Sequence, residues 1–563
     1  MTRRTALALT IVLTAVPPAA PQPQPARARH GMVAAQSERA AAVGRDVLRA
    51  GGNAVDAAVA TAFALAVTYP AAGNIGGGGF LVYRAASGET SAYDFRETAP
   101  AAATATMFLV DGRYDRTRHH QGALSSGVPG TVAGLHLAWQ DHGRRPWKQL
   151  LDPAVQLARR GFAVSEGLAR SLKDVLPAMA PYPASVAQFS RRGAPYESGE
   201  VLRQPDLGRT LARIGASGPA GFYRGETAAL VEKAMKGAGG LLTQADLGAY
   251  VAHRRTPLQG RYRGLDVVSM PPASAGGTAL LEMLNILEGY DVASRGPGSA
   301  AFVHVAAEAM RRAYADRARF LGDPDFNPAM PIERLVSRSY AEELRRSIRE
   351  NRASTSAPDR FEWPHESPET THISVVDAEG NAVALTYTLE GGYGSRIVVP
   401  GAGFLLNNEM GDFNAGPGLT DREGLIGTEP NLAAPGKRML SSMTPTILSK
   451  DGRVFMVVGA AGGRKIVNAV LLTILNVVDF GMNAQQAVDT PRFHHQWLPD
   501  QILHERWGLS ADTLERLHAL GHTTSDAWPA GSPTAVHAIV RRDGGELEGG
   551  VDRRTTDGAA LGH

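Results

Sequence analysis

The feature that most constrains the fold is a pair of β-branched runs on either side of the sequence Asp-Ala-Glu-Gly-Asn. The runs span residues 370–376 and 382–388, and Ala378-Glu379-Gly380 lies between them as the loop. A three-residue connection that ends in a left-handed glycine is a favoured way to close a β-hairpin. The sequence therefore predicts a hairpin in which Thr370 lies opposite Thr388.

Side chains alternate between the two faces of a strand, so this register separates apolar from polar residues. One face carries Ile373, Val375, Val383, Leu385 and Tyr387. The other carries Thr370, His372, Ser374, Ala382, Ala384, Thr386 and Thr388. We expect the first face to be core and the second to be open to chemistry, and a slip of one residue would exchange them.

The segment before the hairpin has the composition of an exposed linker. Residues 350–369 are rich in Ser and Pro and show neither a helical nor a strand period. Strand propensity alone would explain a Thr-rich hairpin. A linker that runs directly into a buried strand favours a second interpretation, in which the chain is cut between Glu369 and Thr370.

This cut would make Thr370 a nucleophile that carries its own base. A Thr hydroxyl reacts poorly until a base takes its proton, and the α-amine of an N-terminal Thr can do so. Such an amine titrates near pH ~7.7–8.0, close to the pH at which a general base works best. Thr388, across the hairpin, is placed to accept a hydrogen bond from the attacking hydroxyl and hold its rotamer.

Two motifs in this half of the chain resemble those of the γ-glutamyltranspeptidases, or glutathione hydrolases. They are Thr370-Thr371-His372-x-Ser374-Val375-Val376-Asp377 with Thr388, and the run from Gly403 to Phe413. The resemblance extends from about Gly31 to the C-terminus. It implies an N-terminal-nucleophile hydrolase made as a proenzyme that cleaves itself before the Thr. The implied fold is an α/β, four-layer α/β/β/α sandwich, in which a large chain (29–369) and a small catalytic chain (370–563) are interwoven.

The resemblance also implies which residues bind the α-carboxylate of the substrate. Arg96, in an Arg-Glu-Thr-Ala-Pro motif, would hold it together with Ser441 and Ser442. The planar fork of Arg suits a bidentate carboxylate contact. The alternative for Arg96 is a weak local ion pair at the surface.

Two acids and two glycines complete the implied site. Glu409 and Asp412 would take the α-ammonium, so one end of the pocket would be basic and hydroxylated and the other acidic. The backbone amides of Gly462 and Gly463, at a strand–glycine–helix junction, would form an oxyanion hole. One such donor lowers the barrier by ~3–4 kcal/mol. A tight turn that needs glycine only for steric reasons is the alternative.

The chain departs from the family pattern at two places. Many members carry Asn two residues after the second Thr, where this chain has Glu390. A third carboxylate beside Glu409 and Asp412 should strengthen ammonium binding or raise a carboxyl pKa. The loop 417–437 has the length of a lid but lacks its closing Tyr, and we hypothesise that Arg422 pairs with Glu390 instead.

The N-terminus has the pattern of a secretory signal. Met1-Thr2-Arg3-Arg4 precedes an apolar run over 6–16 and a Pro/Ala segment over 17–28. The run is shorter than the ~20 residues that span a bilayer. Cleavage after residue 20 or residue 28 fits equally, giving a signal peptide of up to 28 residues, and the alternative is a disordered terminus. We expect an exported protein, periplasmic or secreted, without a membrane span.

Composition and motif spacing exclude several functions. Cysteine is absent, which excludes disulfides and thiol catalysis. The net charge is only +3, from 58 basic and 55 acidic residues, and no basic tract predicts a nucleic-acid partner. The pairs His119-His120 and His494-His495 lack the spacing that places two imidazoles on one helix face. We expect no metal and no organic cofactor.

The sequence thus predicts a γ-glutamyltransferase and glutathione hydrolase. Thr370 would form a γ-glutamyl ester from glutathione or another γ-glutamyl compound. Water or an amino-acid or peptide acceptor would release it, and the active form would be a heterodimer of the two subunits. Two alternatives are a cephalosporin or glutaryl acylase, which Asp412 disfavours, and a catalytically silent exported binding protein, which would remain a single uncleaved chain.

Overall fold

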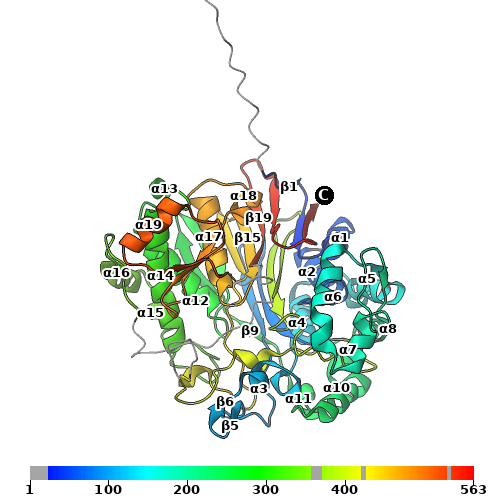
Figure 1. Ribbon diagram of the computed structural model, residues 1–563. Coiled ribbons are helices and arrows are strands. Elements are labelled where there is room, and N and C mark those ends of the chain that lie inside the picture. Colours follow the sequence, from blue (N-terminus) through cyan, green and yellow to red (C-terminus); the bar gives the residue numbers. More distant parts are fainter. Residues whose placement is uncertain (1–22, 357–369, 420–426, 529–533) are drawn as a thin grey trace, which may run out of the picture.

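The computed structural model describes residues 23–356, 370–419, 427–528 and 534–563. Within them, two antiparallel sheets of seven strands each pack face to face (Figure 1). The first has the order β1 (Ala26–Ala28), β20 (Leu547–Val551), β19 (Ala535–Arg541), β15 (Arg453–Ala461), β14 (Thr446–Lys450), β11 (Leu265–Ser269) and β10 (Leu258–Tyr262). The second has the order β21 (Ala559–Gly562), β2 (Met32–Ala35), β12 (Thr371–Val376), β13 (Ala382–Thr388), β3 (Gly78–Arg84), β4 (Thr90–Phe95) and β9 (His253–Arg255).

Helices cover the outer face of each sheet (Figure 1). The first sheet is covered by α12 (Gly276–Leu287), α14 (Ala300–Phe320) and α17 (Lys465–Val478). The second is covered by α1 (Glu38–Arg49), α2 (Ala54–Thr68), α4 (Thr131–His142) and α5 (Trp147–Arg160). The four-layer α/β/β/α sandwich is therefore confirmed. Strands from before and after residue 370 pair within both sheets, so the predicted large and small chains would be interwoven.

Shorter elements surround these layers. Further helices are α3 (Arg116–His120), α6 (Glu166–Met179), α7 (Pro183–Phe189), α8 (Pro205–Ser217), α9 (Ala220–Tyr223), α10 (Gly225–Ala238), α11 (Gln244–Ala249), α13 (Val292–Arg295), α15 (Ile332–Leu335), α16 (Arg338–Arg346), α18 (Ala484–Asp489) and α19 (Ala511–Ala519). Short strands are β5 (Leu109–Val110), β6 (Arg113–Tyr114), β7 (Phe162–Ala163), β8 (Val201–Leu202), β16 (Phe493–His494), β17 (Ile502–His504) and β18 (Thr524–Ser525). In the described part of the chain, no helix combines the length and apolarity needed to cross a bilayer.

The predicted hairpin is formed by β12 and β13 at the centre of the second sheet. Thr371 pairs with Tyr387 and Val376 with Ala382, so the predicted register is confirmed. Gly380 in the loop has a φ of 92°, in the left-handed region that a glycine adopts without strain. The register places Thr370 opposite Thr388, at the end of the hairpin away from its loop.

The prediction that the polar face of the hairpin is open was wrong for most of its length. His372 and Ser374 are fully buried, because this face packs against the first sheet. The ring of His372 bonds to Thr386 Oγ1 through Nδ1 at 2.8 Å and to Ser374 Oγ through Nε2 at 3.0 Å. Buried polar atoms need partners, and these three side chains satisfy one another. The end of the face that carries Thr370 and Thr388 lines a pocket.

A buried pair of carboxyl groups between α12 and α14 leads to a prediction about stability. Burial, and then the nearby charge of Asp316, raises the pKa of Glu282 well above its usual value. Glu282 is therefore protonated in the folded protein at a pH where the unfolded chain ionises it. Stability is then lost as the pH rises from about 4.3 toward the folded pKa, by up to about 1.4 kcal/mol per pH unit.

Glu282→Gln is expected to remove this loss, because Gln has the shape of the neutral acid and does not titrate. Urea unfolding should show a larger gain in the free energy of unfolding at pH 8 than at pH 5. Glu515→Gln, on the exposed side of α19, is the control and should change neither value. An equal gain from Glu282→Gln at both pH values would contradict the prediction.

Candidate active site

A pocket opens where the hairpin ends. It is lined by Arg96, Thr370, Thr388, Glu390, Glu409, Asp412, Ser441, Ser442, Met443, Gly463 and Ile466. The fold thus brings together predicted site residues from widely separated segments of the chain. Gly462 precedes a lining residue, and Glu369 lies outside the described residues.

The two threonines meet at the floor of this pocket. Thr370 retains only 6% of its surface exposed, and its hydroxyl donates to Thr388 Oγ1 at 3.4 Å. Thr388 Oγ1 also accepts the backbone N–H of Glu390 at 2.9 Å. The backbone after β13 therefore holds Thr388 in place beside the Thr370 hydroxyl.

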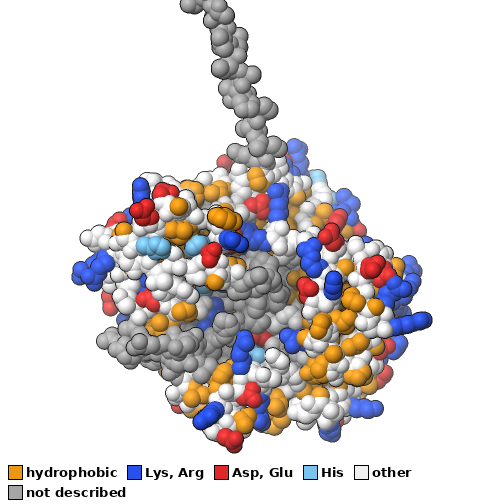
Figure 2. Space-filling view, in the orientation of Figure 1, with side chains coloured by type: hydrophobic (Ala, Val, Ile, Leu, Met, Phe, Trp, Pro, Cys, Tyr) orange, Lys and Arg blue, Asp and Glu red, His pale blue; other side chains and the backbone are white. Residues whose placement is uncertain are grey.

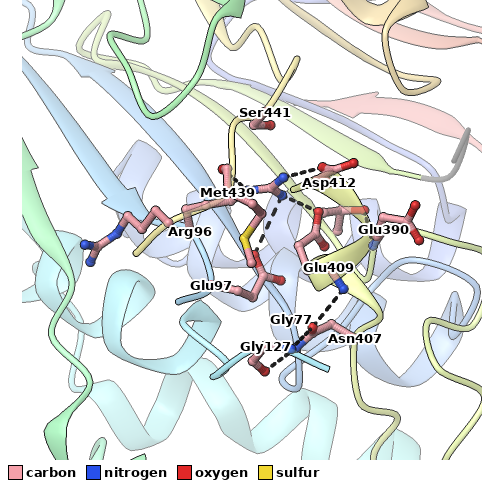
Figure 3. Close-up of polar contacts among 12 residues, drawn as sticks. Gly77, Arg96, Glu97, Gly127, Glu390, Asn407, Glu409, Asp412, Met439 and Ser441 are labelled. Atoms are coloured by element: carbon pink, nitrogen blue, oxygen red, sulfur yellow. Dashed lines mark hydrogen bonds and ion pairs between the residues drawn. The ribbon is translucent and has the colours of Figure 1, made fainter. Parts of the chain in front are cut away.

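Arg96 is the centre of a buried ion network (Figure 3). Its guanidinium bonds to Glu409 through Nη1 and to Asp412 through Nη2, and Nη1 lies 3.7 Å from Glu97 Oε2. Nε donates to the carbonyl of Met439 at 3.2 Å. The interpretation of Arg96 as a surface ion pair was therefore wrong, because the residue is fully buried after β4.

The basic and acidic ends expected for the pocket are not separated. Arg96 contacts Glu409 and Asp412 directly, because the loop after Asn407 returns both acids to the end of β4 (Figure 3). Asn407 fixes this loop, since its side chain accepts the N–H of Gly127 at 2.8 Å and the N–H of Glu409 at 3.0 Å. The pocket therefore presents one guanidinium already neutralised by acids.

Burial changes the ionisation of these groups. It raises the pKa of Glu97 to about 7 and that of Glu409 well above its usual range, although Arg96 opposes both shifts. Burial alone would lower the pKa of Arg96, but the charges of Glu409, Asp412 and Glu97 raise it. Arg96 therefore stays charged, and Glu97 and Glu409 are the groups that hold a proton near neutral pH.

Glu390 contacts Asn408 and His120. Its Oε2 accepts a hydrogen bond from Asn408 Nδ2, and its Oε1 lies 3.5 Å from His120 Nδ1. Glu390 has a φ of 75°, which is uncommon for a residue other than glycine and turns the chain sharply after Thr388. The partner hypothesised from the sequence, Arg422, lies outside the described residues.

Arg317 is a site residue that the sequence analysis missed. It is 2% exposed, and its Nη2 donates to Ser442 Oγ at 2.9 Å. A charged residue in a long helix usually lies on the solvated face. The spacing from Met310 and Tyr314, both fully buried, puts Arg317 on the buried face of α14, and this spacing was the available signal.

Gly462 and Gly463 lie at the junction of β15 and α17, as the sequence predicts. Gly462 has a φ of 131°, and a Cβ at this position would lie 2.9 Å from Thr534 Cγ2. Gly462→Ala is therefore expected to displace the junction and lower kcat by ~10²–10³-fold, the usual cost of losing one oxyanion donor. Steady-state kinetics of the purified variant would measure this.

Gly481→Ala is the matched control at the other end of α17. Gly481 also has a positive φ, 66°, but nothing lies within 4 Å of the position of its missing Cβ. It therefore isolates the cost of backbone strain. Equal effects of the two variants on kcat would contradict a role for the Gly462 junction.

One histidine cluster away from the pocket has the spacing of metal ligands. Among the described residues, His304, Glu308 and His522 offer atoms within 4.8 Å of one another. Both oxygens of Glu308 already bind other groups, Oε1 at 3.3 Å from Arg311 Nε and Oε2 at 2.6 Å from Arg312 Nη1. Burial raises the pKa of Glu308, but the arginines outweigh it and lower the pKa to about 2. The cluster is better described as an ion network.

The chain is similar to known proteins over most of its length. A family model described as Gamma-glutamyltranspeptidase matches residues 40–562. The chain is 46% identical over 547 residues to a glutathione hydrolase proenzyme of Escherichia coli (strain K12), covering 96% of this chain and 93% of the relative. It is 37% identical to the acylase ACY 1 proenzyme of Pseudomonas sp. (strain SE83), covering 89% and 88%.

Solved structures give the same result for the fold. The crystal structure of cephalosporin acylase from Bacillus halodurans superposes with a TM-score of 0.84 at 27% sequence identity. The match covers 98% of this chain and 99% of that one. Both the sequence matches and the four-layer fold extend over nearly the whole chain, and the chain belongs to the γ-glutamyltranspeptidase family.

Proposed function

We propose that this protein is a self-processing γ-glutamyltransferase and glutathione hydrolase. The observation that carries the proposal is the pocket itself. It joins a threonine pair at a hairpin end to three carboxyl groups, those of Glu390, Glu409 and Asp412, and to two serine hydroxyls. A sequence identity of 46% to a glutathione hydrolase proenzyme, over nearly the full length of the chain, supports the same activity.

The reaction would begin with cleavage between Glu369 and Thr370. The freed α-amine takes the proton of the Thr370 hydroxyl, which attacks the γ-carbonyl carbon of the donor. The amides of Gly462 and Gly463 stabilise the oxyanion. The leaving amine departs with a proton, and a γ-glutamyl ester remains on Thr370. Water or the amine of an amino-acid or peptide acceptor then releases the γ-glutamyl group.

The donor head group would be recognised by charge. Glu390, Glu409 and Asp412 surround its α-ammonium, and Ser441 and Ser442 bind its α-carboxylate. Arg96 is already bonded to two acids, so it reaches the carboxylate only by sharing its N–H groups with them. A zwitterionic amino-acid group fits this pocket better than an acyl chain without an ammonium does.

The mature protein would be a heterodimer of residues 29–369 and 370–563. The larger chain would start a few residues earlier if the leader is cleaved after residue 20. Ala26–Ala28 form β1, which pairs with β20, so cleavage of the leader after residue 20 preserves this edge strand. The protein would be exported to a periplasm or to the medium. On the face drawn in Figure 2, basic and acidic side chains are interspersed.

The test is one preparation of purified protein with three measurements. Gel electrophoresis should show two fragments, and N-terminal sequencing of the smaller one should begin at Thr370. The protein should turn over γ-glutamyl-p-nitroanilide faster than a glutaryl cephalosporin. Faster turnover of the glutaryl cephalosporin would instead indicate an acylase, which is the second candidate because the fold is similar to that of a cephalosporin acylase. A single inactive band would indicate the silent binding protein.

A further inference from the structure

The turn that follows β13 is held by one residue, Asn408. Its backbone N–H donates to the carbonyl of Leu389 at 2.9 Å, and its Oδ1 accepts the N–H of Gly391 at 2.8 Å. Its Nδ2 donates to Glu390 Oε2 and, at 3.1 Å, to the carbonyl of His120. Asn408 is 4% exposed, so a single buried residue bonds to three successive residues of the turn.

The backbone fixes the direction of the hydrogen bond to Glu390. A backbone N–H can only donate and a carbonyl can only accept, so the contacts with Gly391 and His120 decide which end of the Asn408 amide is the oxygen. Nδ2 is therefore the end that faces Glu390, and the Glu390 carboxyl group is the acceptor. A carboxylate in place of the Asn408 amide would repel Glu390.

The same turn reaches the predicted nucleophile. Glu390 has a φ of 75°, a conformation that residues other than glycine keep only where surrounding contacts hold it. Its N–H donates to Thr388 Oγ1 at 2.9 Å, and Thr388 Oγ1 accepts the Thr370 hydroxyl at 3.4 Å. The side chain of Glu390 thus lines the pocket, while its backbone orients the partner of Thr370.

We propose that Asn408 is a positioning residue that couples recognition of the donor's α-ammonium to the orientation of Thr370. Its bond to the Glu390 carboxyl group holds that acid at the pocket. Its bonds to the backbone on either side of Glu390 keep the Glu390 N–H on Thr388. This inference rests on the proposed γ-glutamyl function, since it assumes a donor that carries an ammonium group.

The experiment exchanges the two partners of this hydrogen bond and measures kcat and KM separately with γ-glutamyl-p-nitroanilide. Asn408→Asp keeps the shape but has no donor toward Glu390. It should lower kcat by ~10–100-fold, the range for losing a hydrogen bond to a charged group, and should also raise KM. Glu390→Gln still accepts from Asn408, so it should raise KM and leave kcat within about threefold of wild type. In the double variant the introduced amide donates to the introduced carboxylate, so kcat should recover most of its loss while KM stays as high as in Glu390→Gln.

Two further variants separate positioning from structure. Asn476→Asp, near the end of α17 remote from the pocket, removes a similarly buried donor, which bonds to the carbonyl of Ala487 at 3.1 Å. It should lower the free energy of unfolding as Asn408→Asp does but leave kcat and KM unchanged. Asn408→Ala offers no carboxylate to the introduced amide, so Glu390→Gln should not restore kcat in that background. Processing is checked on gels, and if Asn408→Asp fails to mature, recovery of maturation in its double variant is the expected result.

The possible results distinguish the role of Asn408 from the proposed function. A double variant no better than Asn408→Asp, or a loss from Asn408→Asp confined to KM, would overturn the role of Asn408 and leave the proposed function intact. Equal recovery in the Asn408→Ala background would do the same. A mature wild-type protein that does not turn over γ-glutamyl-p-nitroanilide would overturn the proposed function, and the role of Asn408 would fall with it.

Discussion

Thr370→Ala is expected to leave the chain as one uncleaved polypeptide and to lower turnover of γ-glutamyl-p-nitroanilide by at least about 10⁴-fold. Both effects have one cause, because the same hydroxyl would attack the preceding peptide bond and later the donor. Alanine keeps the strand and its pairing but has no nucleophile. Electrophoresis of the purified variant and a chromogenic assay at saturating donor measure the two effects.

Thr371→Ala is the matched control for this variant. Thr371 is the next residue, its side chain is on the opposite face of β12, and its buried hydroxyl makes no hydrogen bond with the described residues. Its loss should leave processing and turnover within a few-fold of wild type. Thr370→Ser should retain both activities in part. A cleaved or active Thr370→Ala protein would refute the proposed mechanism.

Arg96→Met is expected to destabilise the folded protein by ~3–5 kcal/mol at pH 8, the usual cost of removing one partner of a buried ion pair. Met fills similar volume but leaves Glu97, Glu409 and Asp412 without the cation that they contact. Those of the three that are still ionised must then take up protons to stay buried. Their folded pKa values rise, so the destabilisation should shrink as the pH falls toward 5.

Arg254→Met is the contrasting control for this prediction. Arg254 forms an ion pair with Asp141 at 2.6 Å, but its side chain is 59% exposed. Surface pairs of this kind are worth ~0–1 kcal/mol. Urea unfolding of both variants at pH 5 and pH 8 measures the difference. If Arg96→Met lowers the free energy of unfolding no more than Arg254→Met does, or if its effect does not depend on pH, the ion network described here is wrong.

Local patterns predicted the parts of the structure that depend on neighbours in the chain. The register of the β12–β13 hairpin follows from the loop that contains Gly380 and from the alternation of apolar and polar residues along the strands. Both features involve only a few neighbouring residues. The four-layer fold and the set of pocket residues were predicted through family motifs rather than from periodicity. Positions within those motifs, such as Asp412 and Ser441, do line one pocket.

Contacts between distant segments account for what the sequence analysis missed. The polar hairpin face is buried because the first sheet, which contains β15 and β19, packs on it. Arg317 reaches Ser442 across 125 positions of chain, and no local pattern relates the two. His120, the last residue of α3, likewise contacts Glu390 only because this helix lies beside the turn that follows β13.

By itself the sequence determined a hairpin with a threonine at each side of its open end, because turn chemistry and alternation are local. Only the tertiary structure decided which charges meet there. Arg96 belongs to a motif that predicts a carboxylate ligand, yet folding places it against Glu409 and Asp412, since burying any of these charges alone would cost several kcal/mol. Electrostatic pairing inside a protein is set by burial and distance, and neither quantity can be inferred from the spacing of residues in the sequence.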